Sequence, residues 1–381
     1  MDTLQSLLSD LVAIDSVNPS LVAGAAGEAE VARFAAHWLT RAGLEVELEE
    51  VLPGRPNVVA RARGTGGGRS LLLNGHLDTV GVEGMPDAHR PRVAEGRLYG
   101  RGAYDMKGGV AAAMVATARA RELGLPGDVV FTGVMDEEHA GLGSSAVCQH
   151  LSAGVRIDGA IVAEPTELEL ALAHKGFVWF EIETLGVAAH GSRPQLGVDA
   201  IVRMGRFLNE LGALDHRLRT GPPHPLLGGG SVHASLISGG RELSTYPDQC
   251  RLSLERRTIP GQTAGGAETE LSEILERLGR EDPSFRATLR RGLERVPLET
   301  GEDEPLVAAA RQGAETVLGR PAPACGVSYW SDAATLAAAG IPTVLFGPLG
   351  AGAHAAEEWV DLSSVSQCVE MYLETARRFC G

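Results

Sequence analysis

The residues of this chain that are suited to chemistry are two histidines and five carboxylates, most of them placed where a short apolar run ends. They are His76, Asp78, Asp105, Glu137, Glu138, Glu164 and His354. In an open α/β sheet, ligands bind outside the carboxyl ends of the strands, so residues far apart in sequence can meet in one crevice. Imidazoles and carboxylates together suit dications such as Zn²⁺, Co²⁺ and Mn²⁺. The sequence therefore predicts a metal site.

His76 and Asp78 stand two residues apart at a strand end, so their side chains should point the same way. Both could approach one metal, or Asp78 could accept the second ring N–H of His76 and fix its tautomer. Asp105 precedes a helix expected over 107–123, where an aspartate is a good cap. Its two oxygens would equally allow it to bind one metal or to bridge two.

Glu137 and Glu138 are neighbours after the apolar run VVFTGVM and Asp136. On an extended segment, neighbouring side chains point in opposite directions, which favours two different roles. One glutamate could bind metal while the other acts as general base on water. Glu164 precedes a proline that keeps it extended, and His354 lies in a glycine-rich loop. Each residue alone could be an ordinary solvated group, and it is their combination that favours a shared site.

The pattern of apolar residues predicts an α/β fold with two domains. Helices are expected over about 4–14, 27–42 and 107–123, and strands near 44–51, 57–63, 69–75, 128–135, 158–163 and 169–174. The short runs LLL and AIV suit a sheet that is buried on both faces. Residues 178–294 then follow the order βαββαβ, which is typical of a compact split-βαβ unit. We therefore expect a larger domain over 1–177 and 295–381, interrupted by a smaller domain over 178–294.

Composition narrows the classes of function. The 381 residues carry a net charge of −15, which argues against nucleic acid or an anionic membrane as a partner. No segment approaches the roughly 20 apolar residues of a membrane span. The five cysteines show no CxxC spacing, which favours free thiols in a reducing compartment. With an amphipathic helix rather than a signal peptide at the start, a cytoplasmic location is expected. The sequence contains no GxSxG nucleophile motif.

Eight segments, taken in order along the chain, resemble a known family. They are NGHLDTV, GRGAYDMKGGVAA, DEEHAGLGS, VAEPT, AAHGSRPQLGVDAI, LERRTIPG, SYWSDAATLAAAGIPTVLFGP and GAHAAEEWV. The chain is similar to the M20 family of metallopeptidases and deacylases, which includes acetylornithine deacetylase, succinyl-diaminopimelate desuccinylase, aminoacylase and carboxypeptidase G. The resemblance implies a zinc-hydrolase catalytic domain with a mixed or parallel sheet, and an inserted ferredoxin-like lid domain that can form dimers.

The resemblance also implies a role for each candidate residue. One metal would be held by His76, Asp105 and Glu164, and the second by Asp105, Glu138 and His354, with Asp105 bridging. Glu137 would be the general base, and Asp78 would orient His76. From the lid domain, His190 would reach the reacting carbonyl, in dimeric relatives from the other subunit. Arg257, or its neighbour Arg256, would face the substrate carboxylate. His233 stands where many relatives have asparagine and is a candidate substrate contact.

The expected function is a two-metal amidohydrolase that cleaves the amide bond of a small N-acyl amino acid, like acetylornithine deacetylase or succinyl-diaminopimelate desuccinylase. Two divalent ions are expected as cofactors, with Zn²⁺ the first choice and Co²⁺ or Mn²⁺ as alternatives. The expected partners are a small N-acyl amino acid or short peptide and a second copy of the chain, bound through the lid domain. Carboxypeptidase G-like or dipeptidase activity is an alternative. A metal-binding protein without catalysis is a second, and the presence of Glu137 and His190 argues against it.

Overall fold

The computed structural model describes residues 2–151 and 156–381. The chain divides into two compact units. The first unit comprises Met1–Leu172, Thr300–Cys325 and Ser331–Gly381, and the second comprises Ala173–Glu299 and Gly326–Trp330. The boundaries differ by about five residues from those expected at 177/178 and 294/295, because the connecting residues on either side of the inserted segment also belong to the second unit.

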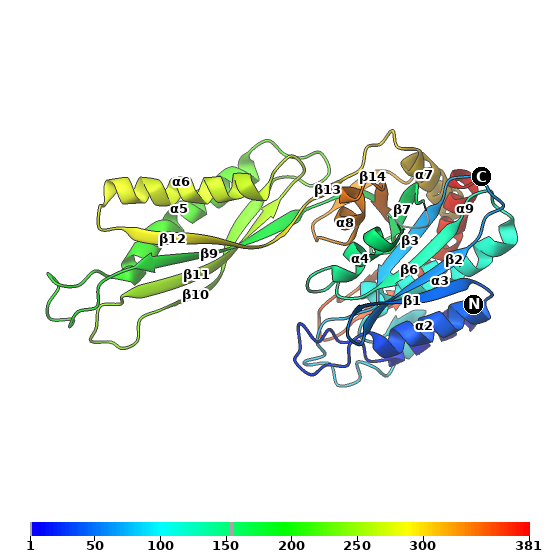
Figure 1. Ribbon diagram of the computed structural model, residues 1–381, viewed down its shortest axis with the longest axis horizontal. Helices are drawn as coiled ribbons and strands as arrows, with labels where there is room; N and C mark the ends of the chain where they lie inside the picture. The colour runs from blue at the N-terminus through cyan, green and yellow to red at the C-terminus, as the bar shows by residue number, and fades with distance from the viewer. Residues whose placement is uncertain (1, 152–155) are drawn as a thin grey trace. The chain divides into compact units, whose positions relative to one another are not determined.

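A mixed sheet forms the centre of the first unit, in the strand order β1-β2-β6-β3-β7-β15-β8, and Figure 1 labels the first five of these strands. These strands are β1 (Glu45–Leu52), β2 (Arg55–Ala62), β3 (Leu71–His76), β6 (Val129–Val134), β7 (Gly159–Val162), β8 (Leu170–His174) and β15 (Thr343–Leu345), and β13 (Leu298–Glu299) and β14 (Ala324–Val327) pair with β8. β3 runs parallel to β6 and β7, whereas β2 pairs antiparallel with β1 and β6. The expected mixed α/β fold is confirmed.

Every residue of β3 and β6 is buried. Because successive strand residues face opposite ways, both faces of this sheet must be covered. The helices are α1 (Asp2–Ala13), α2 (Ala29–Arg41), α3 (Gly108–Ala120), α4 (Leu142–Leu151), α7 (Pro305–Leu318), α8 (Ala333–Ala338) and α9 (Leu362–Phe379). Of the elements over 4–174 that were expected from the sequence, each lies within a few residues of its range. No described helix is long and apolar enough to cross a membrane.

Several elements of the first unit were not expected. α9 begins at Leu362, and the side chain of the preceding Asp361 accepts the main-chain N–H of Ser364 and caps the helix. A separate small sheet has the order β16-β17-β5-β4. Its strands are β4 (Arg92–Ala94), β5 (Arg97–Tyr99), β16 (Gly350–Ala351) and β17 (Trp359–Asp361). These strands hold two or three residues each, too few to show a periodic pattern in sequence.

The second unit is an antiparallel sheet of order β10-β11-β9-β12 covered by two helices (Figure 1). Its elements are β9 (Gly176–Leu185), α5 (Ala200–Thr220), β10 (Ser231–Gly239), β11 (Gln249–Thr258), α6 (Ala264–Glu281) and β12 (Arg286–Arg295). They follow the βαββαβ order read from the sequence. Alternate residues of β9 and β11, such as Phe180 and Leu254, join α5 and α6 in one apolar core, so the opposite face of the sheet stays open.

Candidate metal centre

His76 is the last residue of β3 and is buried. Its Nδ1 lies 2.9 Å from the main-chain oxygen of Asp78. Because a carbonyl oxygen can only accept, Nδ1 carries a proton and Nε2 is the nitrogen available to a metal. Nε2 lies 3.2 Å from Asp105 Oδ1 and 3.8 Å from Glu164 Oε1. Burial alone would lower the pKa of His76, but the Asp105 hydrogen bond and the Glu164 charge outweigh it and raise that pKa well above its usual value.

The carboxylate of Asp78 does not hydrogen-bond the His76 ring and instead binds the turn that carries Glu137 and Glu138. Asp78 Oδ1 is 3.7 Å from His76 Nδ1, beyond hydrogen-bond range. Its oxygens instead accept the main-chain N–H groups of Glu137 and Glu138, both at 3.1 Å, and the side-chain amide of Asn18 at 2.8 Å. Burial raises the pKa of Asp78 to about 7. The side chain anchors the turn that carries the two glutamates, and its main-chain oxygen orients His76.

Asp105 lies between the two candidate histidines. Its Oδ1 is 3.2 Å from His76 Nε2, and its Oδ2 is 3.4 Å from His354 Nε2. Burial would raise the pKa of Asp105, but the hydrogen bonds with His354 and His76 outweigh it and lower that pKa. The reading of Asp105 as a helix cap is wrong, because it sits in the turn Ala103–Lys107 and α3 begins only at Gly108. Each oxygen of this ionised carboxylate faces a different imidazole.

Glu137 and Glu138 lie in a turn and not on an extended segment. The prediction that their side chains point in opposite directions, as neighbours on an extended segment do, is therefore wrong in its reason. The turn follows Asp136, which adopts a left-handed conformation with φ 68°. Glu138 Oε2 is 3.0 Å from His354 Nε2. Its other oxygen, Oε1, is buried and has no hydrogen-bond partner among the described residues. A buried acceptor without a partner is costly, and a bound cation would satisfy it.

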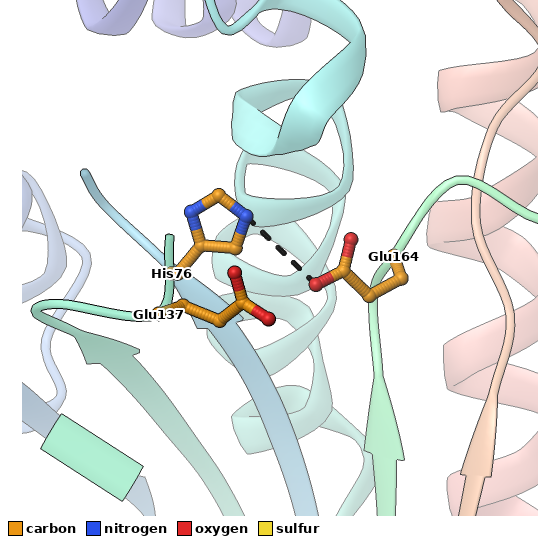
Figure 2. A group of neighbouring side chains, drawn as sticks. All are labelled: His76, Glu137 and Glu164. Carbon is orange, nitrogen blue, oxygen red and sulfur yellow. Dashed lines mark ion pairs between the residues drawn. The ribbon is translucent and has the colours of Figure 1, made fainter. Parts of the chain in front are cut away.

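Glu137 and Glu164 both lie close to His76. Figure 2 shows the three side chains pointing toward one another, and each offers an atom within 4.8 Å of the others. His76, Asp105 and Glu138 form a second group by the same measure. Burial raises the pKa of Glu137 and of Glu164 well above the usual value. The short distances among His76, Glu137 and Glu164 would allow Glu137 to bind a metal as well as to act as a base.

The donor set of the cluster fits divalent metal. Two imidazoles face four carboxylates, and burying this excess of negative charge without compensation would be expensive. Imidazole nitrogen with carboxylate oxygen is a usual ligand set for Zn²⁺ and for related dications. His354 is the most exposed member, with 55% of its side chain accessible. Its hydrogen bonds with Asp105 and Glu138 raise its pKa to about 10. A bound dication could hold His354, Asp105 and Glu138 together in place of these hydrogen bonds.

A buried polar network that the sequence did not reveal supports this cluster. Arg55 Nε donates to Glu28 at 2.7 Å, and Nη2 donates to Asp136 at 3.2 Å and to Asn18 at 3.1 Å. Asn18 in turn donates to Asp78. The network ties β2 and the N-terminal segment to the glutamate turn. Single polar residues in separate segments carry no spacing signal, so only the folded chain shows that they meet.

The remaining candidates lie in the second unit. His190 is exposed, and its Nδ1 is 2.7 Å from Ser192 Oγ. His233 is exposed on β10. Arg257 lies on the open face of the sheet, where it donates to Glu255 at 2.6 Å and its guanidinium lies 5.2 Å from the Phe177 ring centroid.

Arg256 faces the opposite way from Arg257. It is 1% exposed and donates to Glu270 at 3.1 Å and to Gln262 at 3.3 Å. The geometry therefore favours Arg257 over Arg256 as a residue that a ligand can reach.

Comparison with known proteins identifies the family of the chain. The model of peptidase family M20/M25/M40 matches residues 72–378. The chain is 32% identical over 401 residues to an acetylornithine deacetylase from Myxococcus xanthus, covering 100% of this chain and 98% of that protein. It is 29% identical over 380 residues to an N-formyl-4-amino-5-aminomethyl-2-methylpyrimidine deformylase from Bacillus subtilis, covering 91% and 88%.

Solved structures share the fold. Aminopeptidase PepT from Bacillus cereus aligns with a TM-score of 0.82 at 18% identity, over 100% of this chain and 99% of that one. The Bacillus subtilis YXEP protein, described as a dinuclear metal-binding peptidase, aligns with a TM-score of 0.75 at 16% identity, over 99% and 97%. The expected family and enzyme class are confirmed. The chain belongs to peptidase family M20/M25/M40 and is a hydrolase that acts on amide or peptide bonds.

Proposed function

We propose that this chain is a two-metal amidohydrolase that cleaves the amide bond of a small N-acyl amino acid. The observation that carries the proposal is the position of Asp105, whose two oxygens lie 3.2 Å from His76 and 3.4 Å from His354. A carboxylate placed between two imidazoles, one oxygen toward each, has the geometry of a bridging ligand. The dinuclear metal site described for the YXEP protein, which shares the fold, is consistent with it.

The ligands divide into two sets that share Asp105. The first ion would be held by His76, Asp105 and Glu164, and the second by Asp105, Glu138 and His354. When bound, such ions polarise a carbonyl group and make water a stronger acid. Zn²⁺ is the first choice for this mixture of nitrogen and oxygen ligands, with Co²⁺ and Mn²⁺ as alternatives.

Glu137 acts as general base in this scheme. Glu138 is paired with His354, which leaves Glu137 as the second carboxylate of the turn, on the side of His76 and Glu164. Asp78 holds both main-chain N–H groups of the turn, so it fixes where the Glu137 carboxylate can reach. Glu137 takes a proton from the attacking water and later gives it to the leaving amine.

Residues of the second unit complete the scheme. By resemblance to the family, the second unit is a lid and dimerisation domain, and His190 donates a hydrogen bond to the oxyanion that forms at the carbonyl. Arg257 binds the carboxylate of the substrate, and His233 contacts the substrate nearby. The exposure of His190 and the open position of Arg257 support these roles.

The relatives favour an acyl group on the substrate nitrogen. Both curated relatives carry names that describe removal of such a group, acetyl in one and formyl in the other. A panel of N-acetyl, N-formyl and N-succinyl amino acids, dipeptides and folyl-glutamate, tested with Zn²⁺, Co²⁺ and Mn²⁺, decides the class. We expect turnover of at least one N-acyl amino acid. Turnover of dipeptides or folyl-glutamate alone would replace the proposal with a peptidase. No turnover with two ions bound would indicate a non-catalytic metal protein.

A further inference from the structure

We infer that Arg101 and Glu358 are positioning residues that fix Asp105 and His354 relative to each other. The two side chains pair at 2.7 Å and are 3% and 1% exposed. Apart from this pair, their charged groups bond main-chain atoms, including the N–H of Asp105 itself. They act on the main chain beside Asp105 and beside His354. This inference rests on the proposed metal site and adds two residues that hold it in shape.

Glu358 accepts four hydrogen bonds from the loop that carries Asp105. Its Oε1 accepts the main-chain N–H groups of Tyr104 at 2.9 Å and of Asp105 itself at 3.0 Å. Its Oε2 accepts Arg101 Nη1 at 2.7 Å and the main-chain N–H of Gly102 at 3.0 Å. All four groups are donors, and two face each oxygen. Only a carboxylate, with two accepting oxygens and no donor, satisfies this arrangement.

Arg101 extends the same contact to the loop that carries His354. Its Nη1 binds Glu358, and its Nη2 donates to the main-chain oxygen of Ala355 at 2.8 Å. Ala355 directly follows His354. The guanidinium, carried by the Asp105 loop, therefore binds the segment after His354 at two points, through two nitrogens in a fixed planar fork. A lysine has the charge but not this fork.

The main chain around the pair reinforces the link. Strand β5 pairs with β17, with Tyr99 opposite Trp359. The next main-chain contact, Gly100 N–H to Glu358 O at 3.1 Å, continues that pairing toward the site. Gly102 then takes a left-handed conformation, and a Cβ there would lie 2.7 Å from Thr79 Cγ2. The Asp105 loop and the His354 loop are thus joined at a defined register, a few residues before Asp105 and a few residues after His354.

A buried ion pair is weak evidence for stability, because desolvation offsets its attraction. A role in holding ligands is the better account of a pair whose contacts all lie in the two ligand loops. Groups that orient metal ligands typically matter by about 10–100-fold in metal affinity or activity. Glu358 holds the main chain of Asp105, and Asp105 belongs to both proposed ion sites. Glu358→Gln should therefore weaken the binding of both ions. Arg101 holds the main chain next to His354, and His354 belongs to one proposed ion site. Arg101→Lys should therefore weaken chiefly the binding of that ion.

The experiment titrates the metal-free protein with Co²⁺, and binding is followed by calorimetry and by visible absorption. Wild type should bind two ions. Glu358→Gln should lose about 10–100-fold in affinity, with an altered Co²⁺ spectrum, while circular dichroism and thermal unfolding of the metal-free protein stay near wild type. Asp128→Asn is the matched control. Asp128 pairs with Arg61 and accepts the Gly64 N–H at 2.8 Å, but it precedes β6, at the end of that strand away from the glutamate turn.

The outcomes separate the inference from the proposal beneath it. If wild type binds no Co²⁺, the metal site itself is wrong. If wild type binds two ions and both variants bind them with wild-type affinity and spectrum, the positioning role is wrong while the metal site stands. If Glu358→Gln does not fold, Arg101→Lys carries the test. Loss of fold in both variants would also overturn the inference, because the pair would then stabilise the whole unit.

Discussion

In the first unit the candidate ligands touch one another, whereas in the second unit His190 and Arg257 each contact a residue two positions away in sequence. His354 reaches Asp105 and Glu138 from segments far apart in the chain. His190 contacts Ser192, and Arg257 contacts Glu255. The first set is therefore assembled by the fold before any substrate arrives. The second set is presented on open surface, and its roles depend on what binds there.

Metal removal should have the largest effect, and it tests the assembled set. Chelation should abolish turnover while the circular dichroism spectrum stays near that of the native protein, because the first unit buries a large apolar core that does not depend on the ions. Restoring Zn²⁺, Co²⁺ or Mn²⁺ should restore turnover. Full activity in protein shown by elemental analysis to hold no metal would end the two-metal account.

The adjacent glutamates sharpen the comparison within the first unit. Glu137→Ala should lower kcat by about 10²–10⁴, the usual contribution of a general base, while both ions stay bound. Glu138→Ala should instead lose one ion, since it removes the carboxylate that pairs with His354. Metal content and kcat, measured on both variants, decide between the roles. Metal loss in Glu137→Ala but not in Glu138→Ala would mean that the two are reversed.

His190 tests whether an exposed residue of the second unit takes part in the chemistry. His190→Ala should keep normal metal content and stability and change KM little, while kcat falls by about 10²–10³, the usual cost of removing one oxyanion donor. Mixing His190→Ala with Glu137→Ala subunits asks whether it acts across a dimer, because a mixed dimer would carry one intact composite site. Near-wild-type kcat in His190→Ala alone would remove it from the mechanism.

The adjacent arginines give the smallest effects and should separate cleanly. Arg257→Ala should raise KM and leave the free energy of unfolding nearly unchanged, because the side chain lies on the open face. Arg256→Ala should lower the free energy of unfolding by about 1–3 kcal/mol, because it leaves acceptors without a partner, and it should affect KM less. Steady-state kinetics and urea unfolding measure both. The opposite pattern would assign the substrate contact to Arg256.

Much of the first unit follows from the sequence. Buried strands such as β3, β6 and β7 are short apolar runs, and His76, the two glutamates and Glu164 lie at or after their ends, so the meeting of these residues could be predicted. What could not be predicted depends on contacts between distant segments. Glu358 accepts the main-chain N–H of Asp105, and Arg55 joins Glu28 to Asp136. The strands β4, β5, β16 and β17 are too short to show a pattern.

Local backbone conformation explains the other differences. The left-handed residue Asp136 turns the chain before Glu137 and Glu138, so an argument from extended geometry failed although both side chains reach the site. Likewise, the His76 ring is held by the main-chain oxygen of Asp78 and not by its carboxylate. Sequence spacing identifies the residue pair in each case, but only the backbone angles decide which atoms meet.

The most direct test of the central claim is a crystal structure of the Zn²⁺-loaded protein with anomalous diffraction at the zinc edge. The account predicts two ions about 3.5–4 Å apart, as in other two-metal sites, with one oxygen of Asp105 on each, His76 and Glu164 on the first, and Glu138 and His354 on the second. A single ion at full occupancy, or two ions that share a ligand other than Asp105, would contradict it.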